Sequence, residues 1–158
     1  MNTIKLFSTF FICILIPLAI GGISGFATAS SISDWYVSLN KPSFNPPNYL
    51  FAPVWTCLYL LMGLSLFLIW KSPAGQDRAN ALIVFTIQIL LNFIWSFLFF
   101  KFRMPGLALI EIVLLWISIL AMIIFFSRIS KPAAYLQIPY LFWVSFASIL
   151  NAAIWRLN

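Results

Sequence analysis

The chain alternates between long apolar segments and short polar ones. Five segments are long and apolar enough to cross a bilayer as helices, which takes about 20 residues each: 5–27, 49–70, 79–100, 105–126 and 133–155. The last four are separated only by KSPAGQDR, KFR and SRISKP. Because these connections are short, we expect helices two to five to form antiparallel hairpins. The pattern predicts an all-α five-helix bundle, with one domain over residues 1–158.

Only the first connection, from about residue 28 to 48, is long, and it is rich in proline and aromatic residues. Loops longer than about 12–15 residues without their own structure are usually functional or disordered, and proline fixes extended or turn geometry. We predict a lid over the open end of the bundle. An aromatic belt at the membrane interface is the alternative. The lid residues would be Trp35, Lys41, Pro42, Pro46 and Pro47.

The first apolar segment has two interpretations. Lys5, the apolar run and the small residues Ala27-Thr28-Ala29 resemble a signal peptide with its cleavage site. The run is longer than a usual signal core, which favours a membrane helix. It also contains Gly21 and Gly25, whose spacing lets two helices approach closely. That contact would lie within the bundle or between two copies of the chain.

Composition fixes the broad class of the protein. Hydrophobic residues make up 63% of the chain and charged residues 8%, against about 25% charged in average soluble domains. We therefore expect an integral, multi-pass membrane protein, of a bacterial cell envelope or alternatively an organelle membrane. The net charge is +6, but the basic residues lie at segment ends. They suit lipid headgroups better than a nucleic acid, and their even distribution leaves orientation open.

The sequence contains no histidine, which excludes imidazole acid–base catalysis and imidazole ligation of haem or metal. The two cysteines, Cys13 and Cys57, lie in different apolar segments without the spacing of a metal site. No metal and no cofactor is therefore expected.

Polar side chains inside the apolar segments are candidates for a binding site, because buried amides in hydrocarbon need hydrogen-bond partners. In the third segment they are Gln88, Asn92 and Ser96, spaced four residues apart. These side chains either face a ligand or form hydrogen bonds with neighbouring helices. In the fifth segment Tyr140, Trp143, Ala147 and Asn151 share one side, after a kink expected at Pro139. That side lines a pocket or packs as an aromatic core.

Glu111 is the one acidic residue well inside a predicted span. Carboxylates within membranes are functional candidates by default. A structural ion pair with Arg103, two helical turns away, is the alternative, as is a carboxylate at the interface. No second acid supports a proton-coupled step.

These motifs resemble the TspO/MBR family, which includes tryptophan-rich sensory proteins and the animal translocator protein. The resemblance rests on Trp35-Tyr36, on KPSFNPP, PVWTCLYLLMG and LNFIWSFLFF, and on PYLFWVSFASILNAAIW, in order along nearly the whole chain. It implies a five-helix bundle, commonly dimeric. The family binds porphyrins, haem-related tetrapyrroles and synthetic aromatic ligands in a cavity closed by the first loop, and some members bind cholesterol.

The resemblance also implies ligand-binding roles for individual residues: Tyr36, Trp55, Asn92, Ser96, Trp143 and Ala147. Bacterial relatives have been proposed to degrade porphyrin in light and oxygen, and Trp55 and Trp143 occupy the corresponding positions. Two residues depart from the pattern. Phe44 replaces the usual tryptophan, and Ala152 replaces the central tyrosine of the sterol-recognition pattern, which argues against sterol as a partner.

Three functions follow from these observations. We predict first a receptor or sensor that binds tetrapyrroles, with aromatic walls against the ring faces. An enzyme that degrades porphyrin through Trp55 and Trp143 is the second, although the sequence offers no nucleophile–base pair. A carrier of tetrapyrrole or sterol is the third, although no inverted repeat supports a conventional transporter.

Overall fold

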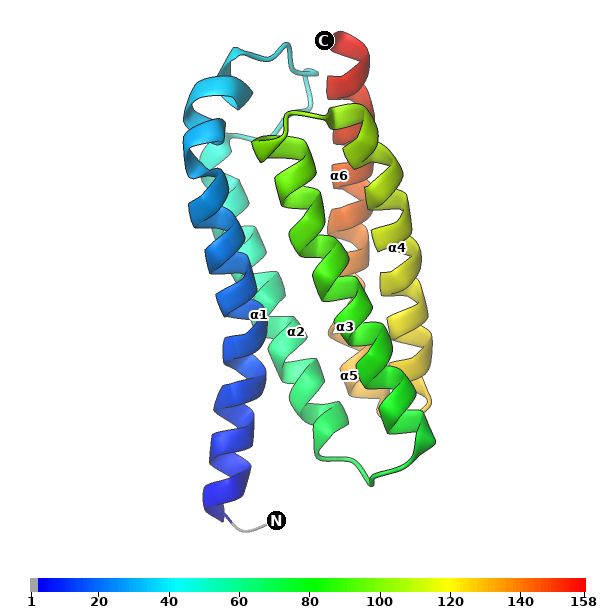
Figure 1. Cartoon of the computed structure of the whole chain (residues 1–158). Coiled ribbons are helices and arrows are strands. Elements are labelled where there is room, and N and C mark those ends of the chain that lie inside the picture. The colour runs from blue at the N-terminus through cyan, green and yellow to red at the C-terminus, as the bar shows by residue number, and fades with distance from the viewer. Residues whose placement is uncertain (1–2) are drawn as a thin grey trace.

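The computed structural model describes residues 3–158, which form a single bundle of helices without strands (Figure 1). Five spans are long and apolar enough to cross a membrane, so the predicted bundle is confirmed. Its α-helices are α1 (Thr3–Ser31), α2 (Phe51–Trp70), α3 (Gln76–Ser96), α4 (Pro105–Ser127), α5 (Lys131–Tyr135) and α6 (Ile138–Leu157). Short π- or 3-10 helical turns flank them: η1 (Ile32–Tyr36), η2 (Asn48–Leu50) and η3 (Phe97–Lys101).

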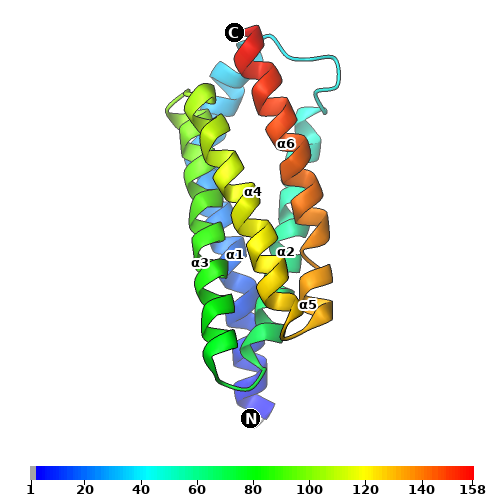
Figure 2. The same cartoon turned by 90° about the vertical axis from the view of Figure 1, so that its right-hand side faces the viewer.

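The bundle is built from helix pairs. Helix α1 packs on α2, α3 packs on α4, and α4 packs on α6. The start of α1 and the end of α6 lie at opposite ends of the bundle, as five spans require (Figure 1). Figure 2 shows the loop before α2 beside the C-terminal end of α6. The central side chains are fully buried and apolar, among them Met62, Ile69, Ile112, Ile119, Met122 and Phe126.

Close helix contact replaces the hydrophobic effect as the cohesive force in lipid, because lipid tails are as apolar as the side chains. The contact between α1 and α2 shows this at Gly63. A Cβ atom on Gly63 would lie 2.7 Å from the Cα atom of Ile14. Only glycine therefore allows the two backbones to approach this closely.

The first helix is longer than predicted, and the expected connection over residues 28–48 is wrong in its first half. Helical structure continues through η1 to residue 38, so the irregular loop covers only 39–47. No proline or glycine interrupts residues 28–38. The hydroxyls of this stretch bond carbonyls three or four residues earlier, as Thr28 does with Ser24 at 2.7 Å and Ser38 with Trp35 at 2.7 Å. These bonds let polar residues continue a helix.

The fifth span is broken where a kink was predicted. Helix α5 ends at Tyr135 and α6 begins at Ile138, one residue before Pro139, which has no backbone N–H to donate. Gln137 fixes the break to α2, since its amide donates to the Ser65 hydroxyl at 2.6 Å. Ser65 in turn donates to the Ala133 carbonyl at 2.8 Å.

Candidate functional site

A cavity of about 560 Å³ lies between α1, α2, α3 and α6, in the half of the bundle nearest the loop over residues 39–47. Its volume lies within the range of about 300–1,000 Å³ that is typical of small-molecule sites. Eight aromatic side chains line it: Tyr36, Phe51, Trp55, Tyr59, Trp95, Phe99, Phe100 and Trp143. The cavity is therefore suited to a flat, largely apolar molecule.

Two stacked pairs supply flat walls on different helices. On α2, the rings of Trp55 and Tyr59 lie 5.6 Å apart, tilted by 28°. On α3 and η3, the rings of Trp95 and Phe99 lie 5.3 Å apart, tilted by 24°. The four-residue spacing of each stacked pair places both rings on one face of a helix.

Glycines of α1 open the cavity on its remaining side. A Cβ atom on Gly22 or Gly25 would meet nothing within 4 Å, and both residues line the cavity. Gly21 differs, because the ring of Tyr59 occupies the space where its Cβ would lie. At Gly21 the helix α1 thus contacts the Tyr59 side chain of α2 within the bundle, whereas Gly25 contributes open space.

Six of the eight predicted ligand-binding residues line this cavity: Tyr36, Trp55, Ser96, Trp143, Ala147 and Asn151. Asn92 and Gln88 do not belong to the lining. Asn92 lies behind the aromatic wall, where its Oδ1 accepts from the Tyr59 hydroxyl at 2.7 Å and its Nδ2 donates to the Tyr140 hydroxyl at 2.9 Å. Gln88 is fully buried, and its side chain makes no hydrogen bond within residues 3–158.

Asn151 lines the cavity, but its amide already bonds the protein. Its Oδ1 accepts from the Trp95 indole at 3.1 Å, and its Nδ2 donates to the Pro105 carbonyl at 2.7 Å. The side chain therefore links α3, α4 and α6. A ligand would meet it at the edge of an existing network.

Sequence reasoning missed Tyr59, Phe51 and Trp95 as lining residues. Tyr59 follows Trp55 by four residues and Trp95 precedes Phe99 by four. The helical spacing of aromatic residues was therefore a usable signal. The missing information was which face of each helix turns inward.

The loop over residues 39–47 is attached to the C-terminal end of α6 and to η1. The backbone N–H of Asn40 donates to the side chain of Asn158 at 2.9 Å, and Asn158 donates back to the Asn40 carbonyl at 3.0 Å. The Tyr36 hydroxyl donates to Asn45 at 2.8 Å, and the ring of Phe44 lies 6.4 Å from that of Phe146.

None of the predicted lid residues belongs to the lining of the cavity. Trp35 lies in η1, and the others lie in the loop over residues 39–47: Lys41, Pro42, Pro46 and Pro47. Trp35 packs edge-on against Phe99 at 5.8 Å. The Lys41 ammonium lies 4.9 Å from the ring centre of Tyr36, which does line the cavity. A positive charge thus stands at the loop end of the site.

Glu111 lies outside this cavity. It is buried, and within the described chain neither carboxylate oxygen has a hydrogen-bond partner. The alternative of an ion pair with Arg103 is therefore wrong, because the two side chains do not meet. Among residues 3–158 no group of three histidine, cysteine, aspartate or glutamate side chains could hold a metal ion.

Comparisons with known proteins agree with this architecture. A model described as the TspO/MBR family matches residues 13–156. The chain is 44% identical over 151 residues to the tryptophan-rich protein TspO of Chlorobaculum tepidum, covering 95% of this chain and 96% of that protein. It is 37% identical over 126 residues to the translocator protein of Homo sapiens, covering 78% and 75%. It is 33% identical over 125 residues to the tryptophan-rich sensory protein of Cereibacter sphaeroides, covering 79% and 77%.

Proposed function

The chain belongs to the TspO/MBR family of multi-pass membrane proteins, and we propose that it is a receptor that binds a tetrapyrrole between its helices. The observation that carries the proposal is the pair of stacked aromatic walls on α2 and on α3 with η3. A tetrapyrrole is a wide, flat ring, and aromatic side chains pack well against such a face. The names of relatives as sensory and translocator proteins agree with a receptor.

The charges of a porphyrin suggest how it would lie. Its carboxylate groups extend from one edge, and the rest of the ring is apolar. Lys41 supplies a positive charge at the loop end, and Asn48 and Ser96 line the cavity with side chains that form no hydrogen bond within the described residues. The carboxylate edge would therefore face the loop, with the apolar edge toward Trp55. The loop would act as the lid.

Titration with protoporphyrin tests this proposal directly. Purified protein in darkness should show saturable quenching of tryptophan fluorescence, because the bound porphyrin would contact the tryptophan side chains that line the cavity. Gly25→Leu should abolish saturable quenching, because its Cβ would meet nothing within 4 Å and the rest of the side chain would extend into the cavity that Gly25 lines. Gly75→Leu, in the connection between α2 and α3 and equally free of neighbours, is the matched control. Equal quenching in wild type and Gly25→Leu would contradict the proposal.

A second candidate is light- and oxygen-dependent breakdown of the bound porphyrin. It is favoured by one observation: Trp55 and Trp143, the two candidate redox residues, both line the cavity. Illumination in air should then bleach the Soret band of the bound ligand. Trp143→Phe should keep binding and lose bleaching if the indole takes part chemically. Equal bleaching by free porphyrin and by the complex would exclude catalysis.

A further inference from the structure

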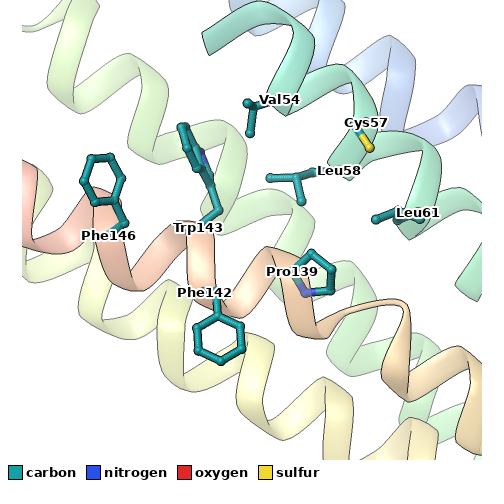
Figure 3. Close-up of a pocket in the computed structure, with 8 residues that line it drawn as sticks. All are labelled: Val54, Cys57, Leu58, Leu61, Pro139, Phe142, Trp143 and Phe146. Atoms are coloured by element: carbon teal, nitrogen blue, oxygen red, sulfur yellow. The ribbon is translucent and has the colours of Figure 1, made fainter. Parts of the chain in front are cut away.

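A second hollow lies on the outside of the bundle, between α2 and α6. It is a groove of about 470 Å³, formed by Val54, Cys57 and Leu61 of α2 and by Pro139, Phe142 and Phe146 of α6, among others (Figure 3). Its side chains are apolar apart from one thiol. Phe142 is 71% exposed at its edge. In a membrane this groove would open to the lipid tails.

The same tryptophan lines both the groove and the inner cavity. Figure 3 shows Trp143 projecting from α6 toward α2. On the cavity side its ring meets Phe51 of α2 edge-on at 6.1 Å, and Phe146 lies 5.6 Å away on the groove side. Trp143 belongs to the lining of both spaces. A single indole ring therefore forms part of the partition between cavity and lipid.

Little besides packing holds this partition in place. The buried indole nitrogen of Trp143 has no hydrogen-bond partner in the described part of the chain. Trp95 and Trp116, by contrast, donate to Asn151 at 3.1 Å and to Ser145 at 2.8 Å. Helix α2 packs closely on α1 and α5 but not on α6. Rotating Trp143 would break no hydrogen bond and separate no tightly packed pair of helices.

The other end of the cavity is closed differently. The loop is held by the paired hydrogen bonds between Asn40 and Asn158 and by the bond from Tyr36 to Asn45. A ligand that passed the loop would have to break these bonds. It would also have to leave the lipid, in which a flat apolar ring is more soluble than in water.

We propose that the groove between α2 and α6 is a lateral entrance, through which a tetrapyrrole dissolved in the bilayer reaches the cavity when the Trp143 side chain rotates. The inference rests on the proposed function, because the cavity is the ligand's destination. It assigns a different role to Trp143: a gate whose position sets the rates of entry and exit.

The test measures rates as well as affinity. Protoporphyrin is preloaded into vesicles, mixed with protein in vesicles, and followed by stopped-flow quenching in darkness. Cys57→Trp and Leu61→Trp each fill the groove. Both should slow association and dissociation at least tenfold and leave the dissociation constant within twofold of wild type. Leu60→Trp, on the same helix and outside both hollows, is the control and should leave the rates unchanged.

The outcomes separate the two proposals. No saturable quenching in wild type would remove the receptor function and, with it, the entrance. Normal affinity with unchanged rates in both groove variants would overturn the entrance alone. Asn158→Ala removes the hydrogen bonds that hold the loop. If this variant binds faster while the groove variants keep wild-type rates, the ligand enters past the loop, and the proposal is likewise overturned.

Discussion

The hydrogen bonds of Asn92 make a prediction that can be worked through from the structure. Its amide joins the hydroxyls of Tyr59 and Tyr140 at 2.7 and 2.9 Å, and so links α3 to α2 and α6. All three side chains are buried, with exposed fractions of 2%, 6% and 1%. Asn92→Ala would leave two phenol hydroxyls without their partner in an apolar interior.

The expected cost follows from the two bonds that are lost. Hydrogen bonds between helices in a bilayer average about 0.6 kcal/mol, with a maximum near 1.7 kcal/mol. Two of them give about 1–3 kcal/mol, which is consistent with the cost of unsatisfied buried groups in general. We therefore expect Asn92→Ala to lower the free energy of unfolding by about 1–3 kcal/mol. It should also weaken porphyrin binding, because Tyr59 carries the stacked wall with Trp55.

A double-mutant cycle isolates the bond from the loss of volume. Unfolding by SDS in mixed micelles, followed by circular dichroism, is measured for Asn92→Ala, Tyr59→Phe and the double variant. The double variant should be more stable than the sum of the single effects by about 0.6–1.7 kcal/mol. Asn92→Ala combined with Trp116→Phe, whose bond goes to Ser145, should be additive. Additivity within about 0.3 kcal/mol for the Asn92–Tyr59 pair would refute the reasoning.

Two further substitutions test the packing of the bundle by the same unfolding assay. Gly63→Ala should lower the free energy of unfolding by about 1–3 kcal/mol, since its Cβ would lie 2.7 Å from the Cα atom of Ile14. Gly22→Ala is the control, because its Cβ would meet nothing within 4 Å. Equal effects of the two substitutions would contradict the close approach of α1 and α2 at Gly63. Gln88→Met should stabilise by about 1–3 kcal/mol, because it removes a buried amide without partners and nearly keeps the volume. Porphyrin affinity should stay unchanged in Gln88→Met, whereas a loss would support the ligand contact that the sequence predicts for Gln88.

The spans could be predicted from sequence because a membrane restricts the backbone so strongly. Every backbone N–H and C=O group in the hydrocarbon region must form a hydrogen bond within the protein, so a long apolar run predicts a helix. The start of α4 at Pro105 and the break before Pro139 follow from the missing N–H of proline. The end of α1 was missed because the connection was expected to begin near residue 28, whereas the hydroxyls of Thr28 and Ser38 bond the helix's own carbonyls and the helical structure continues.

The candidate site could be predicted only in part, because sequence gives a helix's periodicity but not its rotation. Trp143, Ala147 and Asn151 share a face in any α6, and the structure turns that face toward the cavity. Gln88 and Asn92 share a face in α3 in the same way, yet they lie behind the wall. The opening at Gly22 and Gly25 depends on how α1 lies against α2, which sequence alone does not specify.

The polar residues of this bundle explain why its cavity is aromatic. Helices in lipid are not driven together by the hydrophobic effect, so a cavity between them needs directional bonds that hold them at fixed separations. Asn92 joins α3 to α2 and α6, Asn151 joins α6 to α3 and α4, and Gln137 joins the α5–α6 break to α2. Each of these amides is already bonded to protein groups. The surface left for a ligand is therefore mainly the aromatic faces, with Asn48 and Ser96 in the lining and the charge of Lys41 at the loop end. This combination favours a flat molecule with a charged edge over a uniformly polar one.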